Sequence, residues 1–143
     1  MCVSLRRDVN TAQGFTLIEL LVVMVIVAML AGIAYPAYTS HIKRSQRADA
    51  RAELLRLQMM IEKQRLTTLG APPTLPARWI TAPVVGKHYQ LTLQPMGQNY
   101  TLEARALPGD GQADDRQGDS SCAVLSLHVQ GLESRYEPAA CWQ

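Results

Sequence analysis

The sequence predicts an α+β protein in which one long N-terminal helix carries a small antiparallel β-sheet. An apolar run from Phe15 to Ala34 is followed by an amphipathic helical pattern that reaches Gly70. Segments of alternating polar and apolar residues, separated by turns that contain glycine, fill the rest of the chain. With 143 residues, the chain has room for one domain beyond the apolar run. Three or four strands laid on the second half of the helix would bury one face each.

The apolar run has the length of a membrane span. From Phe15 to Ala34 it covers ~30 Å at a rise of ~1.5 Å per residue, which is the thickness of a bilayer's hydrocarbon core. Glu19 is the one charged residue in the run. A charge at the centre of a membrane helix costs about 2.5–3.5 kcal/mol on insertion scales, so Glu19 requires a functional reason.

The residues before the run indicate its orientation. Segment 1–14 is polar and carries Arg6 and Arg7, which favours a cytoplasmic N-terminus. An ordinary cleaved secretory signal is the alternative. Such a signal has an apolar stretch of about 7–15 residues and an A-x-A-like cleavage site. Here the run is longer and ends in Gly32-Ile33-Ala34.

The residues at the start of the run, Gly14-Phe15-Thr16-Leu17-Ile18-Glu19-Leu20, resemble the type IV prepilin signature. The resemblance implies that prepilin peptidase, in the inner membrane, cleaves between Gly14 and Phe15 and then N-methylates Phe15. It makes Glu19 the assembly glutamate and Pro36 the proline that bends the helix. The implied type IV pilin fold divides the chain into a leader (1–14), a transmembrane and assembly segment (15–36), an amphipathic half-helix (37–70) and a β head (71–143).

The spacing of Phe15 and Glu19 supports this reading on physical grounds. After cleavage Phe15 carries an α-amino group with a pKa of about 8, and Glu19 lies four residues on, on the same helix face. The resemblance implies that Glu19 pairs with the Phe15 amine of a neighbouring subunit in the fibre. Removing one partner of a buried ion pair costs about 3–5 kcal/mol, so the pair would select one register. The alternative is a carboxylate that merely sits at the membrane edge.

The second half of the helix is predicted to be one-sided. Leu54, Leu57 and Ile61 widen its apolar face, and Gly70-Ala71-Pro72-Pro73 ends it. The face itself is predicted from apolar residues that recur mostly every three or four positions: Ile42, Ala48, Ala52, Leu55, Met59, Leu66 and Leu69.

A basic patch lies on the same half-helix. It could follow DNA phosphates, but acidic residues such as Asp49 and Glu53 interrupt it, so a solvated or subunit-facing surface is the preferred interpretation. The patch consists of Lys43, Arg44, Arg47, Arg51 and Arg56.

Strands are predicted at 87–94, 99–106 and 122–129, with a possible fourth at 133–136. Segment 72–83 is rich in proline, and we expect it to be irregular with Trp79-Ile80 as a packing anchor.

Segment 107–121 separates the second and third predicted strands. Its Asp110-x-Gln112-x-Asp114 spacing is similar to the start of a calcium loop, but the glycine at the sixth position and the glutamate at the twelfth are missing. We therefore expect no calcium, and we expect a polar, mobile surface loop exposed for contacts.

The cysteines agree with processing. Of three cysteines, the predicted cleavage removes Cys2 and leaves Cys122 and Cys141. A disulfide between these two would contribute about 3 kcal/mol in the chain-entropy model and would hold the C-terminal tail on the third strand. One disulfide closing the C-terminal region is also what the pilin resemblance implies. The cysteine-containing segments are most similar to those of PilE-type minor pilins.

No catalytic constellation or metal-binding spacing is present. His41, His88 and His128 are scattered, so we expect neither enzymatic activity nor a metal or cofactor. The expected function is that of a minor type IV pilin, which supports pilus biogenesis, twitching motility, adhesion or DNA uptake. A type II secretion pseudopilin is the alternative, and a pilus-associated DNA-binding subunit is a second one.

The expected partners and location follow from the resemblance. The partners are other pilin subunits, major and minor, prepilin peptidase and the assembly platform of the inner membrane. The expected location is the bacterial inner membrane, with the N-terminus cytoplasmic and the head periplasmic, and later the extracellular pilus.

Overall fold

A computed structural model describes residues 14–68, 70–81 and 84–143. The predicted leader, apart from Gly14, and Leu69 lie outside these residues. The chain divides into two compact units, one ending at Tyr38 and the other running from Thr39 to Gln143. Helix α1 (Leu17–Thr67) contributes residues to both units, and it ends three residues before Gly70, which has a φ of 80°.

The N-terminal unit consists of the apolar part of α1. Its large apolar side chains from Phe15 to Tyr38 are exposed, and an 18-residue window of α1 has a mean hydropathy of 2.8. The helix is long and apolar enough to cross a membrane, in agreement with the predicted transmembrane helix. Pro36 lies inside α1.

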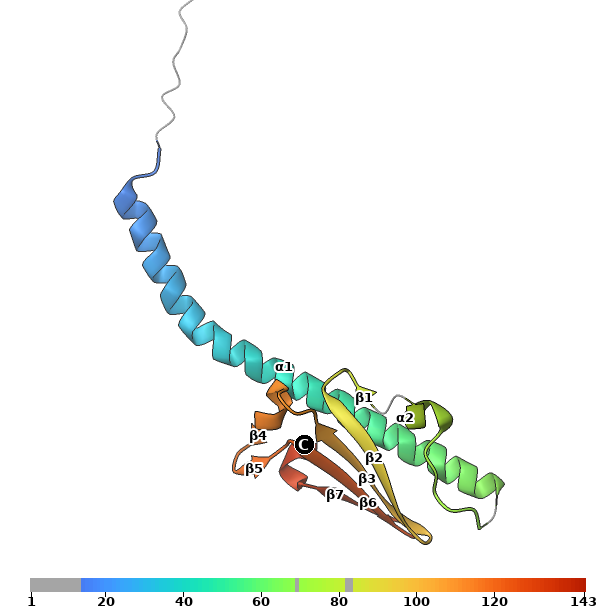
Figure 1. Cartoon of the computed structure of the whole chain (residues 1–143). Helices are drawn as coiled ribbons and strands as arrows, with labels where there is room; N and C mark the ends of the chain where they lie inside the picture. Colours follow the sequence, from blue (N-terminus) through green and yellow to red (C-terminus); the bar gives the residue numbers. More distant parts are fainter. Residues whose placement is uncertain (1–13, 69, 82–83) are drawn as a thin grey trace, which may run out of the picture. The chain divides into compact units, whose positions relative to one another are not determined.

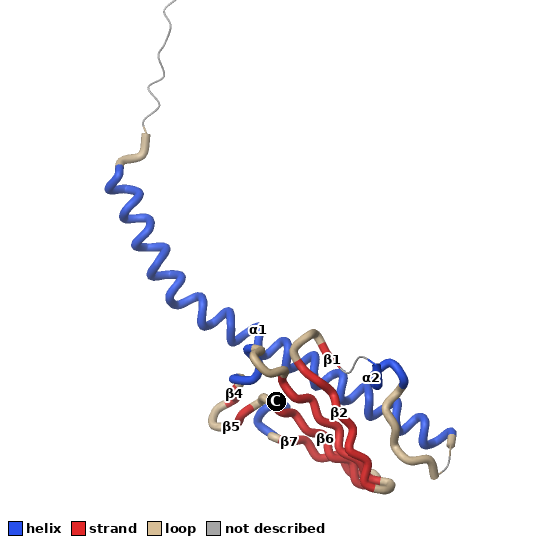
Figure 2. The backbone as a smooth tube through the Cα atoms, viewed as in Figure 1, coloured by secondary structure: helices blue, strands red, loops and turns tan. Residues whose placement is uncertain are grey.

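The C-terminal unit contains a five-stranded antiparallel sheet with strand order β1-β2-β3-β6-β7 (Figure 1). In the view coloured by secondary structure, the long strands lie beside the last part of α1 (Figure 2). A separate two-stranded hairpin, β4-β5, lies between β3 and β6 in the sequence. The strands are β1 Val84–Val85, β2 Tyr89–Met96, β3 Asn99–Ala106, β4 Arg116–Gln117, β5 Ser120–Ser121, β6 Val124–Gln130 and β7 Glu133–Glu137.

The predicted hairpin and the fourth strand are confirmed. Strands β2 and β3 pair from Tyr89 opposite Ala106 to Met96 opposite Asn99, around a two-residue turn in which Gly97 has a φ of 66°. Strand β6 begins at Val124 rather than at Cys122. The reason is that the Cys122 N–H donates to the Asp115 carbonyl at 2.8 Å and is therefore paired with the preceding loop.

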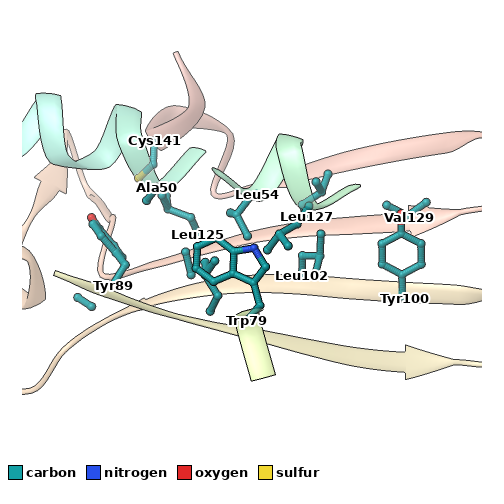
Figure 3. Close-up of a cluster of buried hydrophobic side chains, with 14 of the residues drawn as sticks. Ala50, Leu54, Trp79, Tyr89, Tyr100, Leu102, Leu125, Leu127, Val129 and Cys141 are labelled. Atoms are coloured by element: carbon teal, nitrogen blue, oxygen red, sulfur yellow. The ribbon is translucent and has the colours of Figure 1, made fainter. Parts of the chain in front are cut away.

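The core lies between the sheet and α1. Leu54, Leu57 and Ile61 of α1 are almost fully buried against the inward side chains of β2, β3 and β6. Each buried leucine stabilises the head by about 1.5–3 kcal/mol. Trp79 is also buried, as expected, but its segment forms a short helix, α2 (Ala77–Thr81), where an irregular loop was predicted. Figure 3 shows the Trp79 ring among Leu54, Leu102, Leu125 and Leu127.

The predicted apolar face of α1 is confirmed for Leu54, Leu57 and Ile61 and wrong for most of the other residues assigned to it. Leu55, Met59 and Leu66 are exposed, by 37%, 66% and 81%, and Ala48 and Ala52 are exposed as well. The buried stripe runs instead through Arg47, Ala50, Leu54, Leu57 and Ile61. Both stripes have the same three- and four-residue spacing, so the period alone cannot tell which of them the sheet covers.

Candidate assembly motif and nucleic-acid interface

Phe15 and Glu19 lie at the start of α1, where they line one hollow of about 250 Å³ together with Leu20 and Val23. The Glu19 N–H donates to Oγ1 of Thr16 at 3.3 Å. Thr16 therefore caps the helix, and Glu19 occupies its third residue, where a carboxylate also interacts favourably with the helix dipole. The sequence reasoning missed this second role of Glu19. The signal was the T-x-x-E spacing of a capping box.

A buried ion pair joins α1 to the loop before β4. Arg47 Nη1 lies 3.0 Å from Oδ2 of Asp115, and the two side chains are only 4% and 6% exposed. The guanidinium also donates to Oε1 of Gln117 at 3.1 Å and to Sγ of Cys122 at 3.0 Å. The prediction of a solvated or subunit-facing basic patch is thus wrong for Arg47. This side chain lies on the stripe of α1 that faces the head.

The loop that contains Asp110 is held by a ring of hydrogen bonds. The Tyr89 hydroxyl donates to Gln112 Oε1 at 2.8 Å, and the Gln112 amide donates to Gln46 Oε1. Nε2 of Gln46 and of His88 lie 2.8 Å apart, and Nδ1 of His88 lies 2.9 Å from Oδ2 of Asp110. The Gln112 N–H closes the ring by donating to Oδ1 of Asp110 at 2.9 Å.

This ring corrects the expectation of a mobile, exposed loop at 107–121. Gln112 is completely buried and Asp115 is 4% exposed. Gln112 lies in a short 3-10 helix, η1 (Gly111–Asp114), which Asp110 caps. The loop is anchored because its polar side chains find their partners on α1 and β2, which are distant in the sequence.

Burial and hydrogen bonding in this network shift the pKa values of two of its groups, Tyr89 and Asp110. Burial raises the pKa of Tyr89 well above its ordinary value, so the hydroxyl keeps the proton that it donates. The Gln112 N–H and then the His88 side chain lower the pKa of Asp110. The stabilisation from the Asp110 carboxylate is therefore present above the ordinary aspartate pKa and is lost as the pH falls through its lowered value.

A groove of about 260 Å³ opens beside this anchored loop, between α1 and β4; we call it the basic groove. It holds four cationic side chains and two carboxylates, one of which, Asp115, is paired with Arg47. Its residues are Ser40, Lys43, Arg44, Arg47, Asp114, Asp115, Arg116 and Gln117. Lys43 also lines a second hollow of about 240 Å³, where it lies with His88 and Asp110.

Three of the groove cations carry charge that no carboxylate neutralises. Within the described residues, Lys43 and Arg44 form no ion pair, and Nη2 of Arg116 donates to the backbone carbonyl of Asp119 at 3.2 Å. By contrast, Arg56, Arg65, Arg78, Arg105 and Arg135 each lie within 4.0 Å of a glutamate. The groove therefore gathers three uncompensated cations in one place, although the whole chain has a net charge of only +2.

The C-terminal tail is joined to the groove wall through a disulfide. Cys122 and Cys141 are bonded, as predicted, and both are fully buried. The tail is held further by Trp142, whose ring lies 4.7 Å from that of Tyr136 and whose Nε1 donates to the Glu137 carbonyl at 3.2 Å. Because Arg47 donates to Cys122, the disulfide, the ion pair and the groove form one connected region.

Comparison with known proteins places these features in a family. The model of the prokaryotic N-terminal methylation motif matches residues 9–35. The model of the type IV minor pilin ComP, DNA uptake sequence receptor, matches residues 36–126, which is more than half of the chain. The chain belongs to the ComP minor pilin family. The resemblance of Gly14 to Leu20 to the type IV prepilin signature, and the assignment to the minor pilins, are thereby confirmed.

The two matches divide the chain by role. The methylation motif includes Gly14, Phe15 and Glu19, and the ComP match includes the entire basic groove, the hydrogen-bonded ring and strands β1 to β3. No curated protein and no solved structure was found to match the chain. Of the two matched descriptions, the one that covers the head names a type IV minor pilin.

Proposed function

We propose that this minor pilin binds double-stranded DNA at the basic groove while it is a subunit of a type IV pilus, and that it acts in DNA uptake. The observation that carries the proposal is the ComP match, because its description names a DNA uptake sequence receptor and it spans every residue of the groove. The uncompensated cations Lys43, Arg44 and Arg116 supply the chemistry, since lysine and arginine bind phosphates and release counterions. DNA uptake is thus preferred over twitching motility or adhesion as the role of this subunit.

Binding of DNA by the full-length chain in neutral detergent micelles tests this function. For each phosphate that the chain contacts, the affinity for a duplex should fall by a factor of roughly 3.5 between about 50 and 200 mM salt. Selection from a random duplex pool should enrich one sequence motif if the chain reads sequence, as a receptor does. An affinity that does not change with salt would contradict the proposal. Deletion of the gene should abolish DNA uptake while pili persist on the cells.

We also propose the processing and assembly route of this pilin. Prepilin peptidase cleaves between Gly14 and Phe15 and methylates Phe15, and the assembly platform extracts the subunit from the inner membrane into the fibre. The support is the methylation-motif match together with the exposed apolar surface of residues 17–35. That surface is stable only inside a bilayer or packed among other pilin subunits. In the proposed topology the N-terminus is cytoplasmic and the head is periplasmic.

Glu19→Ala should remove the subunit from the fibre without removing it from the membrane. The Phe15 amine of the neighbouring subunit would be left unpaired, at a cost of about 3–5 kcal/mol, which lowers incorporation by more than about a hundredfold. Immunoblots of sheared pili and of membranes measure the two pools, and Leu20→Ala is the control on the same helix turn. Normal incorporation of the alanine variant would exclude the assembly role of Glu19. N-terminal sequencing that began at a residue other than methylated Phe15 would exclude the cleavage site.

A further inference from the structure

The basic groove has the size of a binding site for one small anion. Its volume of about 260 Å³ is below the ~300–1,000 Å³ of ordinary small-molecule pockets, so it suits a single phosphate group better than a whole nucleotide. The cations come from two places in the sequence. Lys43, Arg44 and Arg47 come from α1, and Arg116 comes from β4.

Arg47 makes one wall of the groove rigid. Its guanidinium donates to Asp115, Gln117 and Cys122, and its Nε is buried with no acceptor among the described residues. Asp115 compensates the charge of Arg47, so this wall adds rigidity rather than free positive charge. The bond from Arg47 to Gln117 holds the residue next to Arg116 in a fixed position. Such pre-organisation lowers the entropy lost when an anion binds.

The rim of the groove can take the anion directly. Arg44 and Arg116 are exposed, and Lys43 is half-buried, with its Cε 3.9 Å from where a Cβ on Gly111 would lie. Asp114 is the one exposed carboxylate on the rim, and it has no ion-pair partner among the described residues. Its negative charge opposes the binding of an anion, so removing that charge should raise the affinity where removing a groove cation lowers it.

We propose that the basic groove binds one phosphate of the DNA backbone through contacts from Lys43, Arg44 and Arg116. Arg47 is a positioning residue behind them. The inference rests on the proposed DNA-binding function and specifies where in the head the backbone is held. A contact of this kind positions the duplex and carries no sequence information by itself. Sequence reading then belongs to other surfaces of the head.

The first experiment compares charge variants of the full-length chain in neutral detergent micelles, with a duplex oligonucleotide as the probe. Lys43→Gln, Arg44→Gln and Arg116→Gln should each weaken binding several-fold. Because the three side chains contact the same phosphate, the triple variant Lys43→Gln/Arg44→Gln/Arg116→Gln should lower the salt slope by about 0.9 in total. Asp114→Asn should strengthen binding. Lys63→Gln, which removes a lysine of α1 outside the groove, should change neither quantity. Near-ultraviolet circular dichroism confirms that each variant is folded.

The second experiment locates the phosphate. In a series of duplexes carrying the sequence selected by the wild type, one phosphate at a time is replaced by a neutral methylphosphonate. One position should weaken binding to the wild type and have no further effect on the triple variant Lys43→Gln/Arg44→Gln/Arg116→Gln. An equal loss of affinity in the two proteins at every position would overturn the proposed single-phosphate site.

The controls separate this inference from the function on which it rests. If the wild type does not bind DNA, both the proposed function and the proposed phosphate site are wrong. If its affinity for DNA falls steeply with salt but the groove variants behave like Lys63→Gln, only the proposed phosphate site is wrong. Native mass spectrometry in phosphatidylglycerol-containing micelles checks the lipid headgroup as another phosphodiester. Loss of that lipid from the triple glutamine variant, with unchanged DNA affinity, would overturn the assignment to DNA.

Discussion

Asp115→Ala is expected to lower the free energy of unfolding of the head by about 3–5 kcal/mol, which is a large fraction of the stability of a small domain. Asp115 is the only carboxylate that contacts Arg47 within the described residues, and both side chains are more than nine-tenths buried. The substitution leaves the guanidinium buried with only the neutral groups of Gln117 and Cys122 as acceptors. The loss comes from this uncompensated charge rather than from the value of the pair itself.

Two comparison variants make the Asp115 prediction specific. Arg47→Met/Asp115→Leu removes both charges and should lie much closer to the wild type than either single change. Glu103→Ala removes an ion pair on the sheet surface, in which Nη2 of Arg105 lies 3.6 Å from Oε2 of Glu103 and the Arg105 side chain is 63% exposed. This substitution should cost at most about 1 kcal/mol. Urea unfolding followed by tryptophan fluorescence measures all of them, because both tryptophans, Trp79 and Trp142, lie in the head. A cost for Asp115→Ala no larger than that for Glu103→Ala would contradict the prediction.

Loss of the disulfide is expected to destabilise the head by about 3 kcal/mol. Cys122 and Cys141 are separated by 19 positions, and loop closure of this length contributes about that amount in the chain-entropy model. The measurement is urea unfolding of Cys141→Ala in a Cys2→Ser background, which prevents exchange with a third thiol. The tail should also loosen, seen as loss of the circular dichroism that arises from the Tyr136–Trp142 contact.

The two cysteines should not be equivalent. Cys122→Ala breaks the disulfide and also removes an acceptor of Arg47, so it should cost about 0.5–1.5 kcal/mol more than Cys141→Ala, which leaves the Cys122 sulfur in place. Reduction of the wild type should reproduce the Cys141→Ala value. Equal costs for the two substitutions would show that the contact between Arg47 and Cys122 contributes nothing.

The features that follow from local patterns were predictable. The hairpin was predicted at 87–94 and 99–106 and is observed at 89–96 and 99–106, because alternation of side chains and a glycine turn are both encoded within a few residues. The membrane helix was visible because its length and apolar character need no tertiary partner. The disulfide followed from counting cysteines once the leader was recognised.

The basic groove could be predicted only in part. The cations of α1 were identified as a patch, but Arg116 was not joined to them, because it approaches through a loop about seventy positions away in the sequence. Gln112 and Asp115 were interpreted as exposed because polar residues between strands usually are. Their burial depends on Gln46, Tyr89 and Arg47, partners that no local pattern indicates.

The sequence by itself determined that a membrane-spanning helix with a prepilin motif is followed by an amphipathic half-helix and an antiparallel head closed by Cys122 and Cys141. Only the tertiary structure decided which stripe of α1 is covered, and therefore that Arg47 is buried while Met59 is exposed. The physical reason is that a helical period defines the spacing of a stripe but not its phase. The phase is selected by the whole sheet, which offers buried apolar contacts to Leu54, Leu57 and Ile61 and a carboxylate to Arg47.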